Sequence, residues 1–273
     1  MRHTIEPTQL DDDDRPVGRF LSRREILVLL GATGTATALA ACGPASGSPS
    51  ASAGTSATAT ATATGTPGAS ASATAGAVVP SCVAVPELTE GPYYIDTDLE
   101  RADIRPDTTT GEVAAGTPLA LTFVVSILDG GACVPLADAV VDVWHCDALG
   151  VYSGVTGDSG NFLRGVQRTD ANGAATITTV YPGWYSGRAV HIHFKVRTEP
   201  DADAGYELTS QLFFDDDVSR QVYAAEPYSS KGTQDVENER DGIYGQSDGT
   251  TLLDAKPSGD GYAALFSIAL QTT

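Results

Sequence analysis

In several runs after residue 117, apolar and polar residues alternate with a period of two, which is the pattern of β-strands with one buried face. The clearest run, PLALTFVVSILD at 118–129, ends at a Gly-Gly turn. The chain has one short helical pattern, at 219–225. Many short strands separated by turns predict an all-β fold, an antiparallel β-sandwich or barrel. Further strands are expected at 139–146, 162–168, 174–180, 189–197, 206–214 and 262–270.

One predicted strand carries two histidines, His191 and His193, with a single residue between them. Side chains at i and i+2 of a strand point to the same face. Two imidazoles on one face can begin a metal site, and they can equally be surface residues. Of the chain's four histidines, His3 lies in the leader, which leaves His145 as a third imidazole. A complete metal site would therefore use His145, carboxylates or tyrosines.

The first 79 residues differ in composition from the rest of the chain. Residues 1–42 contain paired arginines, an apolar stretch and Leu-Ala-Ala-Cys ending at Cys42, which resemble a twin-arginine export signal with a bacterial lipobox. Residues 43–79 are almost wholly Ala, Ser, Thr, Gly and Pro, which predicts a disordered tether. We expect an exported protein, anchored by a lipid on Cys42 at the extracellular face of the cell membrane or secreted, with one folded domain at 80–273. The alternative is a cytoplasmic protein with a disordered tail.

The net charge argues against one class of partner, and the cysteine content predicts a disulfide. The formal net charge of −19 argues against nucleic acid, which binds to basic surfaces. The folded part holds Cys82, Cys133 and Cys146, and two of them can pair outside the cell. Because Cys146 lies in a strand-like run near the candidate site, we expect a Cys82–Cys133 bridge, although three pairings are possible.

Tyr152 and Tyr185 are the tyrosines that the sequence offers as partners for the two histidines. A phenol has a pKa near 10 in water, and a trivalent iron lowers that value by its charge, so that phenolate binds at neutral pH. Phenolate is a hard anion that prefers Fe(III), whereas two histidines with one carboxylate hold Fe(II). A ferric site of this kind suits a substrate that is itself a bidentate oxygen anion, such as a catecholate.

Several stretches, taken in order, resemble the intradiol ring-cleavage dioxygenases, the family of the catechol, hydroxyquinol and protocatechuate dioxygenases. The match to secreted, single-chain bacterial members looks close. It implies an antiparallel β-sandwich of the prealbumin-like type and a non-haem Fe(III). The stretches are TEGPYYID (89–96), HCDALGVYSG (145–154), FLRGVQRTDANG (162–173), TVYPGWYSGRAVHIHFKV (179–196) and TSQLFF (209–214).

The resemblance also implies a role for individual residues. Tyr152 and His191 match the equatorial iron ligands of the family, and Tyr185 and His193 match the axial ones. Tyr185 is the tyrosinate expected to leave the iron when a catechol binds, and to take its proton. The implied reaction inserts O2 between the two hydroxylated carbons of a catechol and gives a muconate-type dicarboxylic acid.

Other residues match positions around the iron. Arg188 matches the arginine that steadies charge developing on the ring, and Gln211 matches a glutamine that lines the pocket. Tyr93 and Tyr94 are candidates for the substrate pocket. Three more are expected in the core or behind the site: Trp144, His145 and Tyr181.

The chain departs from the family pattern at its N-terminal side. Catechol- and hydroxyquinol-cleaving members carry a helical dimerisation domain where this chain has the tether, so their dimer is not expected. Protocatechuate enzymes use two different subunits, and the sequence gives no sign of a partner, so the oligomeric state stays open. Two other functions remain open: a transthyretin-like surface binding module without iron, and a zinc hydrolase that uses His145, His191 and His193.

Overall fold

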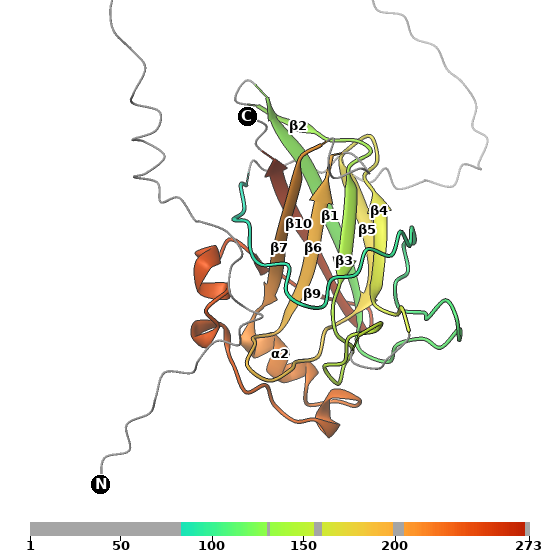
Figure 1. Cartoon of the computed structure of the whole chain (residues 1–273). Coiled ribbons are helices and arrows are strands. Elements are labelled where there is room, and N and C mark those ends of the chain that lie inside the picture. Colours follow the sequence, from blue (N-terminus) through green and yellow to red (C-terminus); the bar gives the residue numbers. More distant parts are fainter. Residues whose placement is uncertain (1–82, 130–131, 156–159, 199–204, 271–273) are drawn as a thin grey trace, which may run out of the picture. The chain divides into compact units, whose positions relative to one another are not determined.

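A computed structural model describes residues 83–129, 132–155, 160–198 and 205–270, so the leader, the tether and Cys82 lie outside the described residues (Figure 1). No helix within these ranges is long and apolar enough to cross a membrane. The strands are β1 Pro118–Asp129, β2 Ala132–Pro135, β3 Val140–Trp144, β4 Arg164–Arg168, β5 Ala174–Val180, β6 His191–Arg197, β7 Glu207–Phe214, β8 Leu252–Leu253, β9 Lys256–Ser258 and β10 Gly261–Leu270. The helical elements are α2 Asp216–Val222 and three 3-10 turns, η2 Tyr228–Ser230, η3 Asn238–Arg240 and η4 Tyr244–Ser247.

The strands form two five-stranded sheets that pack as a sandwich. One sheet has the order β4-β3-β6-β7-β8, and the other has the order β2-β1-β10-β9 with β5 also paired to β1. The predicted all-β sandwich is therefore confirmed. Both sheets are mixed, because β10 runs parallel to β1 and β8 runs parallel to β7, while the other pairs are antiparallel.

The core lies between the sheets and follows from the alternation along each strand. On β6, Ile192, Phe194 and Val196 face the opposite sheet and are fully buried. The Phe194 ring lies 5.4 Å from Phe123 of β1 and 5.7 Å from Phe266 of β10. Burial of each such side chain contributes about 1.5–3 kcal/mol. The same alternation turns His191 and His193 to the outer face of the sheet.

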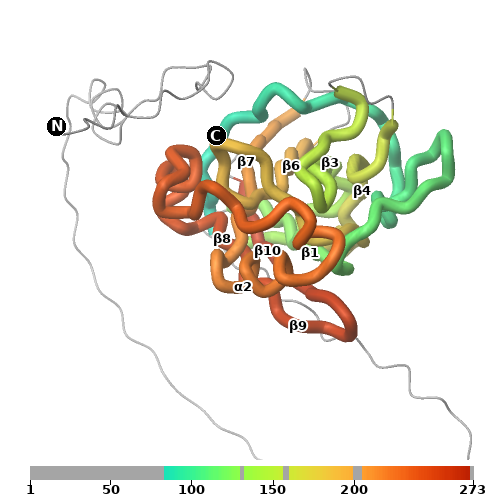
Figure 2. The backbone as a smooth tube through the Cα atoms, turned by 90° about the horizontal axis from the view of Figure 1, so that it is seen from below, coloured from blue at the N-terminus to red at the C-terminus, as the bar shows by residue number. Residues whose placement is uncertain are grey.

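A segment that precedes the first strand covers this outer face. Residues 88–101, which we call the crossing segment, run across β7, β6, β3 and β4 in turn, on the side away from β1 and β10 (Figures 1 and 2). Strand β6 is therefore buried on both faces. The contacts are Leu88 N to Thr209 O (3.0 Å), Lys195 Nζ to Glu90 (2.6 Å), Tyr94 OH to Asp142 (3.3 Å) and Arg101 N to Val166 O (3.0 Å).

Two details differ from the sequence prediction. The short helix was expected at 219–225 but spans Asp216–Val222, because the Asp215 side chain accepts hydrogen bonds from Asp217 N and Val218 N and so caps an earlier start. The strands β2, β8 and β9 were not predicted, since runs of two to four residues are too short to display a period.

Two cysteines of the described part have different states. Cys133 on β2 is disulfide-bonded, whereas Cys146 is a buried free thiol whose pKa burial raises to about 12. The predicted partner of Cys133, Cys82, lies outside the described residues, so that pairing stays a prediction.

The buried carboxyl of Asp142, beneath the crossing segment, makes the free energy of unfolding depend on pH. Burial raises the pKa of Asp142 to about 6, although Arg197 and the Tyr94 hydroxyl oppose this rise. Its unfolded pKa is near 3.9. The folded protein therefore binds this proton more tightly, and the resulting stability is present below pH 4 and is lost as the pH rises through 6.

We expect Asp142→Asn to remove this dependence. Relative to the wild type, the variant should gain about 2–3 kcal/mol in free energy of unfolding between pH 4 and pH 7.5, measured with urea. Asp129→Asn, at the exposed end of β1, is the control and should show no such change with pH. An equal difference between wild type and Asp142→Asn at both pH values would contradict the prediction.

Candidate active site

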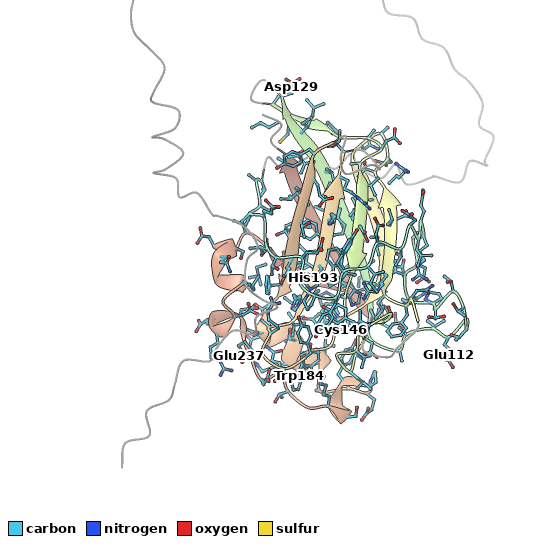
Figure 3. All side chains as sticks on the ribbon, in the orientation of Figure 1. Glu112, Asp129, Cys146, Trp184, His193 and Glu237 are labelled. Atoms are coloured by element: carbon cyan, nitrogen blue, oxygen red, sulfur yellow. The ribbon has the colours of Figure 1, made fainter. Side chains whose placement is uncertain are left out.

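Four aromatic side chains converge on the outer side of the sheet that contains β6. His191 and His193 come from β6, Tyr152 from the loop after β3, and Tyr185 from the loop before β6. The Nε2 atoms of the two histidines are 3.1 Å apart, and the Tyr185 hydroxyl oxygen is 3.3 Å from His191 Nε2. The Tyr152 ring lies 5.8 Å from Tyr185 and 6.2 Å from His193. Figure 3 places His193 away from the Asp129 end of the sandwich.

Close backbone contact brings the two tyrosine loops together. Gly150 has φ +82°, and a Cβ there would lie 2.1 Å from the Trp184 carbonyl oxygen. Only glycine fits that position, because a Cβ would clash with the backbone and because other residues rarely adopt this φ. Lys231 Nζ donates to the same carbonyl oxygen (2.6 Å) and lies 4.7 Å from the Trp184 ring centre. The residues that precede Tyr152 and Tyr185 are thus fixed to each other.

The histidines are neutral, and His191 presents a lone pair to the centre of the group. His191 Nδ1 lies 2.6 Å from the Ala189 carbonyl oxygen and donates to it, so its Nε2 carries the lone pair. Burial, followed by the charge of Arg188, lowers the pKa of His191 to about 3. Burial, together with His191 and Arg188, lowers the pKa of His193 well below its usual value. Neutral imidazole is the form that binds a metal ion.

The phenols complete a set of donors that fits a ferric ion. The Tyr152 hydroxyl is buried and has no hydrogen-bond partner among the described residues. Burial, then the neighbouring Tyr185, raise the pKa of Tyr152. A buried polar atom without a partner is costly, and a cation at the centre of the four rings would remove that cost. No three or more His, Cys, Asp or Glu side chains gather as a metal site within the described ranges, so a site here depends on the tyrosines.

His145 lies in the core and not among the four rings. Its Nδ1 is 2.8 Å from the Cys146 carbonyl oxygen, and its Nε2 is 2.6 Å from the Thr179 hydroxyl. Both ring nitrogens are therefore occupied by hydrogen bonds. A zinc site that used all three histidines would need this side chain to break both bonds, which removes the basis of the zinc hydrolase alternative.

Arg188 and Gln211 lie side by side next to the histidines. Arg188 Nη2 donates to Gln211 Oε1 (2.7 Å), and Gln211 Nε2 donates to the Thr89 carbonyl oxygen in the crossing segment (2.8 Å). The sequence analysis missed Asp241, whose Oδ2 accepts from Arg188 Nε at 2.9 Å. Asp241 lies in a stretch of 3-10 turns without periodicity, and its one local signal is the Asp-Gly pair, which marks a turn.

A family model described as a dioxygenase matches residues 89–227 of this chain. The chain belongs to the intradiol ring-cleavage dioxygenase family. Over 158 residues it is 30% identical to catechol 1,2-dioxygenase 1 of Acinetobacter lwoffii, covering 48% of this chain and 47% of that protein. A chlorocatechol 1,2-dioxygenase of Pseudomonas sp. (strain P51) is 31% identical over 146 residues, 46% of this chain and 54% of that one. The chain thus spans about half the length of these curated relatives.

Solved structures of intradiol dioxygenases have a similar fold. An intradiol ring-cleavage dioxygenase of Tetranychus urticae is 30% identical with a TM-score of 0.61, over 70% of this chain and 95% of that chain. The dioxygenase domain of a dioxygenase carbohydrate-binding protein fusion from Streptomyces sp. SirexAA-E is 28% identical with a TM-score of 0.50, over 70% of this chain and 100% of that chain. The β-sandwich is therefore the fold of the family.

The crossing segment forms one wall of the four-ring group. Gly91 has φ +72°, and a Cβ there would lie 3.2 Å from His193 Cε1, so the backbone passes directly over that ring. Tyr93 stacks on Tyr152 with 4.5 Å between ring centres. Tyr94 instead packs against Trp144 (4.8 Å), which itself stacks on His193. Of the two tyrosines considered for the pocket, Tyr93 lies at the four rings and Tyr94 lies behind Trp144.

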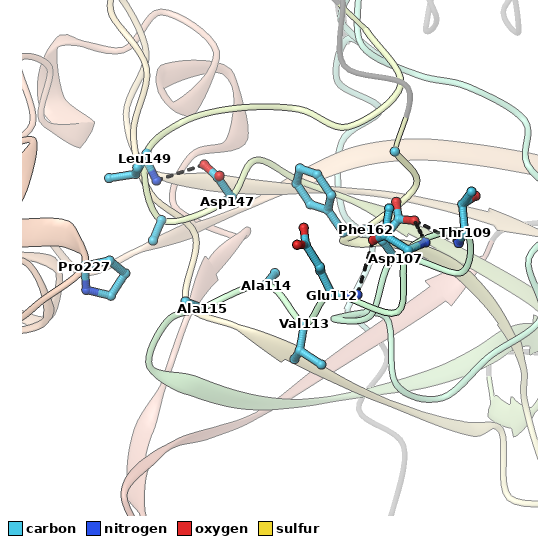
Figure 4. A pocket seen from close by; sticks show the side chains of 13 residues that line it. Asp107, Thr109, Glu112, Val113, Ala114, Ala115, Asp147, Leu149, Phe162 and Pro227 are labelled. Carbon is cyan, nitrogen blue, oxygen red and sulfur yellow. Dashed lines mark hydrogen bonds between the residues drawn. The ribbon is translucent and has the colours of Figure 1, made fainter.

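A separate cavity of about 510 Å³ is not lined by any of the four rings (Figure 4). It lies beside the turns that carry Asp107 and Asp147, with Glu112 between them. Asp107 accepts from Thr109 N (2.8 Å) and Asp147 from Leu149 N (2.9 Å), so these carboxylates stabilise their own turns. Two of the three carboxylates at this cavity are therefore engaged in local turns.

Proposed function

We propose that this protein is an Fe(III)-dependent intradiol dioxygenase that acts on a catechol-type substrate and O2. The convergence of Tyr152, Tyr185, His191 and His193 in a chain of this family is the observation that carries the proposal. The names of the relatives, catechol and chlorocatechol dioxygenases, support the substrate class. In the reaction the bond between the two hydroxylated carbons breaks, and both oxygen atoms of O2 enter the product, a muconate-type dicarboxylic acid.

Different residues of the chain have different roles in this reaction. Ferric iron, when bound, would supply a Lewis acid that makes the ring of the catecholate reactive toward O2. Tyr152, Tyr185, His191 and His193 would hold it. Tyr185 is partly exposed whereas Tyr152 and the histidines are buried, so Tyr185 is the group that an entering catechol meets and that takes its proton. Arg188 supplies a fixed positive charge near the ring.

Colour and oxygen uptake test the function on the full chain. Phenolate bound to Fe(III) absorbs visible light, so the protein supplied with iron should be red to brown and should consume O2 with catechol. With isotopically labelled O2, both labelled atoms should appear in the diacid. A protein that stays colourless with iron and leaves catechol intact would refute the proposal. Catechol binding without O2 uptake would favour the surface binding module instead.

The export signal, the lipid anchor at Cys42 and the tether fall outside the described residues. We propose them from the sequence alone, as a route that would bring the enzyme to the outer face of the cell membrane.

A further inference from the structure

We infer that Asp241 is a positioning residue that fixes the guanidinium of Arg188 beside the four-ring group; this inference rests on the proposed function. Asp241 follows η3 and lies far from Arg188 in the sequence, yet the two form an ion pair with 2.9 Å between Arg188 Nε and Asp241 Oδ2. Both side chains are almost fully buried, with 3% and 0% of their surface exposed. A buried pair of this kind holds one geometry, because neither charge can move into water.

Each oxygen of the Asp241 carboxylate has two donors. Oδ2 accepts from Arg188 Nε and from Ala189 N (2.8 Å). Oδ1 accepts from Ile243 N (2.8 Å) and Tyr244 N (3.0 Å) in its own turn. Although burial raises the pKa of Asp241, Arg188 and these backbone groups hold it below the usual value, so the carboxylate is charged. It therefore joins the turn after η3 to the start of β6.

The turn that carries Asp241 is itself fixed by packing. Ile243 belongs to a small apolar cluster with Leu88, Ala189 and Phe213, and the Tyr244 ring lies 5.2 Å from Phe213. This cluster joins the crossing segment, the start of β6 and the end of β7. Asp241 thus has a rigid base from which to hold the arginine.

The guanidinium is held from a second side by Gln211. Gln211 Nε2 donates to the Thr89 carbonyl oxygen, which orients the amide so that Oε1 accepts from Arg188 Nη2. Two acceptors in fixed places define the plane of the guanidinium, which is flat and has its donors in a rigid fork. Asp241→Asn would remove the charge that Arg188 Nε faces and so weaken one of these two constraints on the guanidinium. Because catalysis by a fixed charge depends on its position, Asp241 acts through Arg188.

The test compares Asp241→Asn with Asp235→Asn in the full-length iron-loaded protein. Asp235 lies in the same segment, and its carboxylate accepts from Ser186 Oγ (2.6 Å). We expect Asp241→Asn to lower kcat about 10–100-fold with KM, iron content and colour little changed, because a small misplacement can cost this much. Asp235→Asn should keep its kcat. Wild-type kcat in Asp241→Asn would overturn the inference.

A second comparison separates positioning from a general structural role. If Asp241 acts through Arg188, adding Asp241→Asn to Arg188→Ala should cause no further loss of kcat. An equal loss in both backgrounds would mean that Asp241 acts through Ala189 N instead, and would overturn the inference. In the metal-free protein, the Arg188 Nε proton, followed by nitrogen-15 NMR, should exchange with water faster in Asp241→Asn than in the wild type.

Two further outcomes matter for the test: a variant that does not fold, and a wild-type protein that does not cleave catechol. If Asp241→Asn does not fold, Arg188→Lys replaces it, since an ammonium keeps the charge but cannot bond both Asp241 and Gln211 in the same way. A wild-type kcat in Arg188→Lys would overturn the inference. A wild-type protein that does not cleave catechol would defeat the proposed function, whereas cleavage by wild type and by Asp241→Asn alike would defeat this inference alone.

Discussion

His193→Ala is expected to lose iron and, with it, all measurable ring cleavage. The ring of His193 lies between Trp144 and the other imidazole, with its Nε2 3.1 Å from that of His191. Removal of the ring takes away one of two nitrogen donors and leaves a hole that water can enter. Because even residues behind a metal ligand contribute about 10–100-fold to metal affinity, loss of the ligand itself should exceed that range.

Iron per folded protein, measured by atomic absorption, tests this prediction, and the visible absorption should disappear in parallel. His145→Asn is the matched control. It removes an equally buried imidazole whose nitrogens are bonded to Cys146 and Thr179 instead of facing the rings. This control should keep its iron in whatever fraction folds. Full iron and normal turnover in His193→Ala would end the assignment of the ligands.

Tyr185→Phe is expected to keep iron in part and to lose turnover. Tyr152, His191 and His193 remain as donors, so iron still binds, but one phenolate fewer should shift and weaken the visible absorption. The variant also lacks the hydroxyl that takes the proton of the catechol. Proton transfer by a positioned side chain contributes about 10²–10⁴-fold, so kcat should fall by that factor.

Tyr181→Phe is the control for Tyr185→Phe. Tyr181 stands four residues earlier in the same Tyr-Pro-Gly-Trp-Tyr run, and its hydroxyl pairs with Ser219 (2.8 Å) in the core. Its loss should leave kcat and colour unchanged. Oxygen uptake with catechol, measured at matched iron content, compares the two variants. Equal turnover in both would show that Tyr185 has no role in proton transfer.

The sequence predicted most strands and the shared face of the two histidines because both depend on local patterns. Alternation assigns Ile192 to the core and His191 and His193 to the other face without any knowledge of the fold. The expectation that Tyr152 and Tyr185 lie beside those histidines came from family resemblance and not from their spacing in the sequence, since loop residues carry no period. Their role as iron ligands is still a proposal.

Other features depend on contacts between distant parts of the chain and could not be predicted. The parallel pairing of β1 with β10 joins Leu119 to Tyr262, and nothing in either strand's alternation states its partner or direction. The crossing segment has no period because it follows backbone and charged groups instead of an apolar face. Asp241 is an acidic residue in a polar stretch, and its burial against Arg188 is visible only in three dimensions.

The crossing segment has a practical consequence for immobilised preparations. Among the described residues, the chain first joins the folded domain where the Val83 carbonyl oxygen accepts from Ala269 N (2.8 Å) and the Pro86 carbonyl oxygen accepts from Ser210 Oγ (2.9 Å), a few residues before Gly91 and Tyr93 reach the rings. Tension applied through an upstream residue would be borne first by these contacts and, once they break, would pull the crossing segment away from His193. A biosensor or column that holds this protein by its carboxyl-terminal end would keep that mechanical load away from the catalytic centre.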